Sequence, residues 1–249
     1  MVEIVSALAV VTVGVVASLI LAGVRSAALR SGHSPGGARR ITLVGAVGIA
    51  GWLGLVAVGS LTGVLTDFSA RPPRMLLVLA GSAALFTAAT RTRTFGRLLA
   101  STPRHWPIAL QSMRVPIELG LWSLFVAGRL PVHMTFEGRN FDVVVGLSAP
   151  IVALALARGW LGVRGAVVWN LLGLGLLVNI VGMAVTTMPG PLQLAWPGPS
   201  NVIVAQFPFV WLPAFLVPVA LFGHVISLRQ LLARRARPTG DAAPRWLGA

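Results

Sequence analysis

Seven long apolar segments, separated by short polar connections, account for most of this chain. A transmembrane helix needs about 20 mostly apolar residues, and segments of this kind cover residues 4–24, 41–65, 75–90, 106–128, 142–157, 166–187 and 202–228. The third and fifth are the shortest. Between the third and fourth, residues 94–101 place apolar side chains on one side of a short helix that would lie at the membrane surface. The pattern predicts an all-α integral membrane bundle of seven transmembrane helices over residues 1–228.

Composition narrows the class of protein further. Hydrophobic residues make up 56% of the chain and charged residues 10%, and the mean hydropathy is +0.85. Soluble domains carry about 25% charged residues, so a soluble enzyme, a disordered chain and a secreted disulfide scaffold are all excluded. The chain has no cysteine, and all 20 basic residues are arginine. This excludes a thiolate nucleophile and a lysine Schiff base.

Arginine is concentrated in every other connection. The basic connections follow the first, third, fifth and seventh segments and contain Arg25, Arg30, Arg39 and Arg40, then Arg91, Arg93, Arg97 and Arg104, then Arg158 and Arg164, then Arg229, Arg234, Arg235, Arg237 and Arg245. The remaining connections hold only Arg71, Arg74, Arg129 and Arg139. Because basic loops stay in the cytosol, the alternation predicts a bacterial inner-membrane protein with its N-terminus outside and its C-terminus in the cytosol.

The two ends of the chain support this orientation. The first segment follows Met1, Val2 and Glu3 rather than a positively charged region, so we expect a retained helix and not a cleaved signal peptide. Residues 229–249 form a basic tail that we expect to be disordered and attracted to anionic lipids at the cytosolic face. No aromatic interleaving or groove-reading motif accompanies these arginines, so a nucleic acid is not an expected partner.

The second segment contains a ladder of glycines. Gly45, Gly48, Gly51 and Gly54 recur at three-residue intervals, followed by Gly59-x-x-x-Gly63. Small residues let helix backbones approach closely in lipid. We expect this ladder to pack inside the bundle, and the alternative is a contact between two copies that would make a homo-oligomer.

The fourth segment carries charged residues where a membrane helix normally has none. At about 100° per residue, Gln111, Arg114 and Glu118 fall within an arc of about 60°. A charge at the bilayer centre costs roughly 2.5–3.5 kcal/mol on insertion scales. Arg114 and Glu118 are four residues apart, so their side chains could form an ion pair across one helical turn. Such a pair either anchors a substrate or relays protons, or it only fixes helix packing.

The connection between the fourth and fifth segments, residues 130–142, is the densest polar cluster on the outer side. It contains His133, Glu137, Arg139, Asn140 and Asp142. The cluster could bind a polar head group or a substrate at the outer mouth. Alternatively it orders itself through Arg139 paired with Glu137 or Asp142. The spacing of His133, Glu137 and Asp142 matches no established zinc or iron pattern, so no metal site is predicted.

Three further polar residues lie inside predicted helices. Asn170 and Asn179 are nine residues apart and therefore on opposite faces of the sixth segment, where each is expected to bond neighbouring structure. His224 lies near the cytosolic end of the seventh segment. We expect it to be hydrogen-bonded within the bundle rather than to bind haem, because His33, His105 and His133 are all in connections.

Two short stretches resemble other sequences. They are Gln111-Ser-Met-Arg-Val-Pro-Ile-Glu118 and Met134-Thr-Phe-Glu-Gly-Arg-Asn-Phe-Asp142. The second resembles a stretch found in a group of uncharacterised bacterial multi-pass membrane proteins. The resemblance implies a membrane protein of similar design and supplies no activity.

The expected function is the binding or translocation of a small polar or amphiphilic molecule, or of protons, around the fourth helix and the 130–142 loop. Glu118 would exchange protons or anchor the ligand, and Arg114 would be its partner or would bind an anionic group. A first alternative is an intramembrane enzyme acting on a lipid or isoprenoid, with Glu118, Glu137 or Asp142 as acid or base. A second is a structural or assembly subunit that uses the second helix. The sequence identifies no cofactor.

Overall fold

The computed structural model describes residues 1–233, and this part of the chain is all-helical. Its helices are α1 (Val2–Arg30), α2 (Pro35–Leu61), α3 (Arg74–Thr90), α4 (Arg93–Ala100), α5 (Trp106–Leu110), α6 (Arg114–Val126), α7 (Asp142–Ala157), α8 (Val163–Thr187) and α9 (Val217–Leu232). Single turns occur at η1 (Gln111–Met113), η2 (Val132–Met134), η3 (Ile203–Ala205) and η4 (Leu212–Leu216). The predicted all-α class is confirmed.

Four helical segments are long and apolar enough to cross a membrane: α1, α2, α8 and the stretch Leu212–Leu232. The pair α3 and α4 meets the same test only as one broken span, bent by 76°. The segment formed by α5, η1 and α6 runs without interruption, and α7 is apolar but only 16 residues long. The chain is therefore a membrane protein of several helices, and the full count of seven spans stays a prediction.

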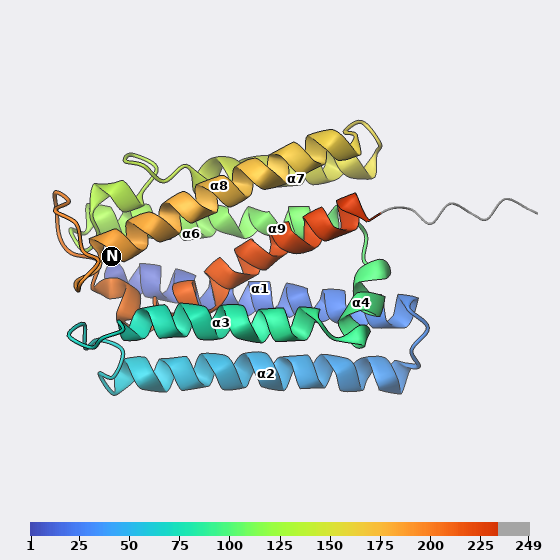
Figure 1. Cartoon of the computed structure of the whole chain (residues 1–249), viewed down its shortest axis with the longest axis horizontal. Coiled ribbons are helices and arrows are strands. Elements are labelled where there is room, and N and C mark those ends of the chain that lie inside the picture. Colours follow the sequence, from blue (N-terminus) through green and yellow to red (C-terminus); the bar gives the residue numbers. More distant parts are fainter. Residues whose placement is uncertain (234–249) are drawn as a thin grey trace, which may run out of the picture.

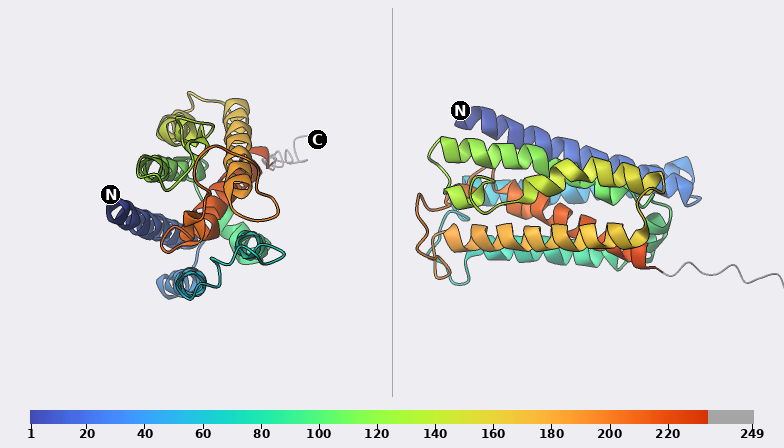
Figure 2. Two further views of the ribbon diagram at one scale, coloured as in Figure 1. Left: turned by 90° about the vertical axis from the view of Figure 1, so that its left-hand side faces the viewer. Right: turned by 90° about the horizontal axis from the view of Figure 1, so that it is seen from above.

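The long helices run side by side along one axis, so the molecule has two distinct ends (Figure 1). The N-terminus, the α2–α3 connection and the segment that precedes α9 gather at one end. Helix α4 and the α1–α2 and α7–α8 connections gather at the other (Figure 1). Viewed along the axis, α9 lies in the middle of the bundle and α2 at its edge (Figure 2). Helix α9 packs against α8, α5 and α3.

The main hydrophobic core lies between these helices. It is formed by side chains from α1, α6, α8 and the start of the last helix, including Val13, Val16, Leu121, Leu124, Leu177 and Phe215.

Local sequence explains several helix ends. Ser34 accepts a hydrogen bond from the Gly37 N–H at the start of α2, and Thr92 does the same for Phe95 at the start of α4. These are standard N-caps.

The seventh predicted segment starts later than expected. Residues 202–211 form a short 3-10 turn and a loop, the helix begins with a π turn at Leu212, and it continues to Leu232. Proline has no N–H to donate and disfavours a helix interior, so Pro208 opposes an earlier start of the helix, whereas Pro213 is tolerated in the first turn. Residues 229–232 of the predicted tail therefore belong to α9, and residues 234–249 lie outside the described residues.

The expectation that the glycine ladder of α2 packs inside the bundle is wrong for most of its members. A Cβ on Gly48, Gly51 or Gly54 would meet no atom within 4 Å. Helix α2 packs chiefly on α1, and only one side of it is covered. Gly63 lies beyond the end of α2 with φ +79°, so Gly59-x-x-x-Gly63 is not a motif on one helix.

The short helix expected over residues 94–101 is confirmed as α4. Leu98 and Leu99 are buried against the bundle, while Arg93 and Arg97 are exposed. Amphipathic helices of this kind lie in the plane of a membrane interface. The sharp bend between α3 and α4 directs α4 across the end of the bundle (Figure 1).

Candidate functional site

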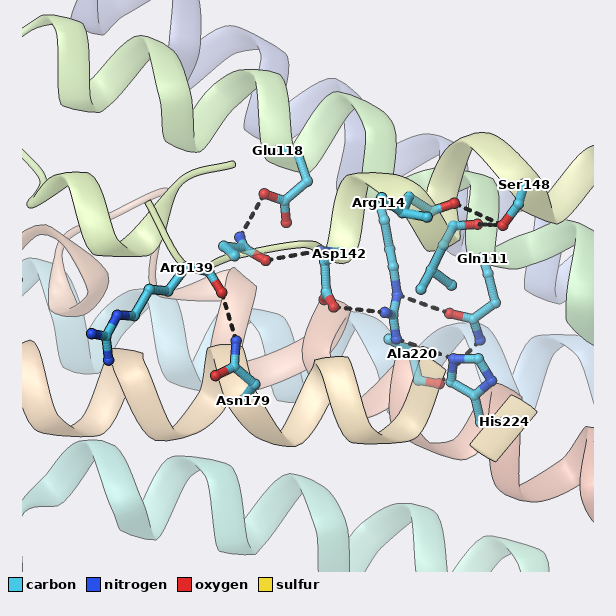
Figure 3. Close-up of polar contacts among 12 residues, drawn as sticks. Gln111, Arg114, Glu118, Arg139, Asp142, Ser148, Asn179, Ala220 and His224 are labelled. Carbon is cyan, nitrogen blue, oxygen red and sulfur yellow. Dashed lines mark hydrogen bonds and ion pairs between the residues drawn. The ribbon is translucent and has the colours of Figure 1, made fainter. Parts of the chain in front are cut away.

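Arg114, the first residue of α6, is at the centre of a buried polar network. Its side chain is 2% exposed, and each of its nitrogens has a different neighbour (Figure 3). Nη1 lies 3.0 Å from Oδ1 of Asp142, an ion pair whose atoms are not aligned as a hydrogen bond. Nε donates to Oε1 of Gln111 at 3.2 Å, and Nη2 donates to Nε2 of His224 at 3.2 Å. One guanidinium thus joins η1, α7 and α9.

The direction of the hydrogen bonds fixes the state of His224. A guanidinium can only donate, so Nε2 of His224 accepts, and the ring proton is on Nδ1. Nδ1 then donates to Oδ1 of Asn170 at 2.9 Å. The amide nitrogen of Asn170 donates to the Ala166 carbonyl and to Oγ of Ser227. His224 is therefore a neutral, hydrogen-bonded link between α8 and α9.

Glycine lets α8 approach this link. A Cβ on Gly173 would collide with the imidazole ring of His224, so no larger residue fits on α8 at that point. The expected roles of His224 and Asn170 as hydrogen-bonded residues within the bundle are confirmed. Sequence analysis did not connect either of them to Arg114, because their separation in sequence gives no sign of their proximity.

Glu118 lies one turn beyond Arg114 on α6 and is 2% exposed. Its Oε2 accepts a hydrogen bond from the amide nitrogen of Asn140. The same nitrogen donates to the Met134 carbonyl at 3.1 Å, and Oδ1 of Asn140 accepts from the Asp142 N–H. Asn140 therefore links Glu118 to the start of α7. Within residues 1–233, Oε1 of Glu118 has no hydrogen-bond partner.

The expected ion pair between Arg114 and Glu118 is wrong, because the carboxylate that pairs with Arg114 is Asp142. The cause is the close contact between α6 and α7. A Cβ on Gly146, one turn into α7, would lie 2.9 Å from the Val115 nitrogen and 3.2 Å from Cβ of Arg114. The absence of that Cβ brings α7 against the start of α6, and Asp142 at the first turn of α7 reaches the guanidinium.

The loop over residues 130–142 folds partly into the bundle, although Glu137, Arg139 and Phe141 are exposed. Leu130, Met134, Thr135 and Asn140 are all at most 4% exposed. Of the five site residues predicted in this loop, Asn140 and Asp142 join the network around Arg114. The structure places His133, Glu137 and Arg139 outside that network.

Tryptophans hold those three residues. Nε1 of Trp122 donates to Oε1 of Glu137 at 2.7 Å. The guanidinium of Arg139 lies 5.3 Å from the Trp196 ring centroid, and the His133 ring is 4.8 Å from the same centroid. Among the described residues Arg139 forms no ion pair with Glu137 or Asp142, so the expectation that such a pair orders the loop is wrong. Asn179 bonds the loop directly, at the Arg139 carbonyl.

A cavity of about 110 Å³ lies between α3, α6, α8 and the segment that leads into α9. Its walls are apolar except for four residues: Arg114, Glu118, Asp142 and Asn201. Asn201 is fully buried, and neither atom of its side-chain amide has a hydrogen-bond partner. Asn201 is not recognisable from the sequence, since it lies in an irregular connection where an asparagine is ordinary. The arrangement suits a molecule with an apolar body and a polar group.

Comparison with known proteins gives a family without an assigned activity. Residues 72–232 match the family described as a domain of unknown function, DUF8737. No curated protein and no solved structure matches the chain. The matched region runs from the residues just before α3 to the end of α9 and includes the whole polar network and the cavity. Because it covers more than half of the chain, this protein belongs to the DUF8737 family.

Proposed function

We propose that this protein binds a small amphiphilic molecule inside the membrane, in the cavity next to Glu118. The observation that carries the proposal is the composition of that cavity: apolar walls, with charged side chains and one unpartnered amide among them. Burying a polar group without a partner costs roughly 1–3 kcal/mol. A ligand that bonds the Asn201 amide would remove that cost.

The charges in the cavity indicate which polar group fits. Arg114 and Asp142 neutralise each other as an ion pair. Glu118 adds a carboxylate with a free oxygen, and Asn201 adds one donor and one acceptor. The preferred ligand therefore presents a hydrogen-bond donor or a cationic group to Glu118. Its hydrocarbon part would lie along Leu121, Ile180 and Leu216.

Binding is favoured over passage of protons along the network. On the far side of Arg114 from Glu118, the polar side chains are bonded to each other through His224 and Asn170. A guanidinium does not release its proton in proteins, so Arg114 interrupts this route. An intramembrane enzyme remains the second candidate, because two carboxylates, Glu118 and Asp142, line one cavity.

The proposed topology is seven spans, with the N-terminus outside and the C-terminus in the cytosol of a bacterial inner membrane. The distribution of charge supports it. The end of the bundle that carries α4 also carries exposed arginines such as Arg30, Arg91 and Arg164. The opposite end carries Glu3, Asp67 and Glu137. The basic end of a membrane protein faces the cytosol, so this asymmetry favours the proposed orientation.

Co-purification tests the binding proposal. The full-length protein is purified in a mild detergent, and its bound small molecules are extracted and identified by mass spectrometry. We expect one amphiphile to be enriched with the wild type. Glu118→Gln should deplete it about tenfold, because the substitution removes about one hydrogen bond to a charged group. Ala184→Trp, which fills the cavity, should give the same depletion.

Two matched variants control for general damage. Glu137→Gln removes a carboxylate outside the cavity, and Val178→Trp adds bulk on the exposed face of α8. Both should retain the amphiphile at the wild-type level. Equal amounts of every amphiphile in wild type and cavity variants would contradict the proposal.

A further inference from the structure

A second cavity, of about 270 Å³, lies at the other end of the bundle, beside α4. It is enclosed by α1, α3, α4, α5 and α9, and its walls include Gly23, Phe86, Ala89, Leu99, Trp106 and Ile226. No residue lines both this cavity and the one next to Glu118. The second cavity is therefore a separate site with no charged residue in its walls.

Two arginines are fixed at the edge of this cavity. Arg229 lies one helical turn beyond Ile226 on α9 and donates to the carbonyl of Thr90, which itself lines the cavity. Arg30 lies one turn beyond Ala27 on α1 and donates to the Ser101 carbonyl at 2.8 Å. Both side chains are exposed. Each is thus held beside the cavity while part of its guanidinium remains free to bind another group.

The positive charge at this end has no acidic counterpart among residues 1–233. The exposed arginines there also include Arg91, Arg93 and Arg97, on and next to α4. Over residues 1–233 the ion pairs are Arg74 with Asp67 and Arg114 with Asp142. These five arginines therefore lack a carboxylate partner in the described part of the chain, and they attract an anion from outside it.

We infer that this cavity holds an acyl chain of an anionic phospholipid whose phosphate lies against Arg30 and Arg229. The apolar walls accept the hydrocarbon, and guanidinium groups bind phosphate oxygens through paired hydrogen bonds. Helix α4, with buried leucines on one side and exposed arginines on the other, lies where lipid head groups meet the hydrocarbon. The site requires only that this end faces the cytosolic leaflet, and it does not depend on a ligand at Glu118.

Native mass spectrometry of the full-length protein in detergent tests the inference. Phosphatidylglycerol and phosphatidylcholine with identical acyl chains are titrated separately. Because one arginine near a membrane surface contributes about fivefold in affinity, we expect phosphatidylglycerol to bind about tenfold or more tightly than phosphatidylcholine. Arg30→Gln and Arg229→Gln should each weaken phosphatidylglycerol binding about fivefold. Arg164→Gln changes an exposed arginine on α8 at the same end of the bundle, and it should not weaken phosphatidylglycerol binding.

A second pair of variants tests the acyl chain. Ala89 is exposed and lines the cavity, whereas its neighbour Ala88 is exposed and does not. Ala89→Phe should abolish the tightly bound lipid, and Ala88→Phe should leave it in place. Glycerophosphoglycerol, the head group without chains, should not compete. Equal affinity for both lipids, or unchanged binding in Ala89→Phe, would overturn the inference without affecting the site at Glu118.

Discussion

At the scale of single residues, the central feature is that three charged side chains are buried together. Arg114 and Asp142 form an ion pair, and Glu118 is bonded to Asn140 instead of to the arginine. Breaking a buried ion pair costs about 3–5 kcal/mol, because one charge is left without a partner. Which carboxylate is the true partner can therefore be measured.

We expect Arg114→Leu to destabilise the protein by about 3–5 kcal/mol. Adding Asp142→Leu should restore much of the lost stability, since the stranded carboxylate is then gone. Adding Glu118→Leu instead should restore less, because Glu118 keeps its bond to Asn140 in either case. Thermal unfolding of the three variants in detergent gives the comparison. Greater recovery with Glu118→Leu would mean that Arg114 pairs with Glu118.

Part of this site could be predicted from the sequence. The spacing of Gln111, Arg114 and Glu118 placed them on one face of a helix, and they do share one buried region. The pairing was not predictable, because a spacing of four residues permits an ion pair and does not require it. Asp142 reaches Arg114 because α7 packs closely against the start of α6 and the loop before Asp142 folds partly into the bundle. No sequence pattern states how deep a polar loop lies.

At the scale of helices, contact between α6 and α7 is what brings Asp142 to Arg114. Gly146→Leu should push α7 away and destabilise the protein by about 1–3 kcal/mol, the usual cost of overpacking. Gly175→Leu is the matched control on α8, where an added Cβ meets no atom within 4 Å. Unfolding temperatures of the two variants test this directly. Equal stability would show that α6 and α7 are not in close contact.

Helix α2 gives a second comparison. Leu53 packs against the main core, whereas Gly51 faces open space. Leu53→Ala should therefore lower the unfolding temperature more than Gly51→Leu, although glycine ladders usually mark tight helix contacts. The opposite order in the full-length protein would place the glycine face in a contact, such as one between two copies.

The helices themselves were largely predictable, because length and apolar character are local properties. Their ends were less so. The last helix begins about ten residues after the predicted start, and Pro208 in the preceding stretch disfavours an earlier start. The position of α2 at the edge of the bundle was also not predictable. Glycine spacing shows that a close approach is permitted, and it does not show that a neighbour is present.

At the scale of the whole molecule, the proposed topology rests on the separation of charge between the two ends. We expect an epitope tag inserted at Leu192, in the exposed connection before the last helix, to be accessible from outside the cell. A tag at the C-terminus should be accessible only after the membrane is permeabilised. Antibody labelling of intact and permeabilised cells gives the result. Finding both tags in one compartment would contradict the seven-span arrangement.

The two cavities suit different ligands. The cavity next to Glu118 contains charges and an unpartnered amide, so its ligand must present a polar group within the bundle. The cavity beside α4 has no charge in its walls and arginines at its edge, which suits a lipid with its head group outside the protein. The two sites can be occupied independently, because no residue lines both.

The most direct test of the central claim is a map of the full-length protein in lipid nanodiscs, determined by electron cryomicroscopy with a bound antibody fragment to add mass. We expect elongated non-protein density in the cavity next to Glu118. One end of that density should lie within hydrogen-bond distance of Glu118 and of the Asn201 amide. A cavity that is closed, or one in which protein groups bond Glu118 and Asn201 and leave no space for a ligand, would contradict this claim.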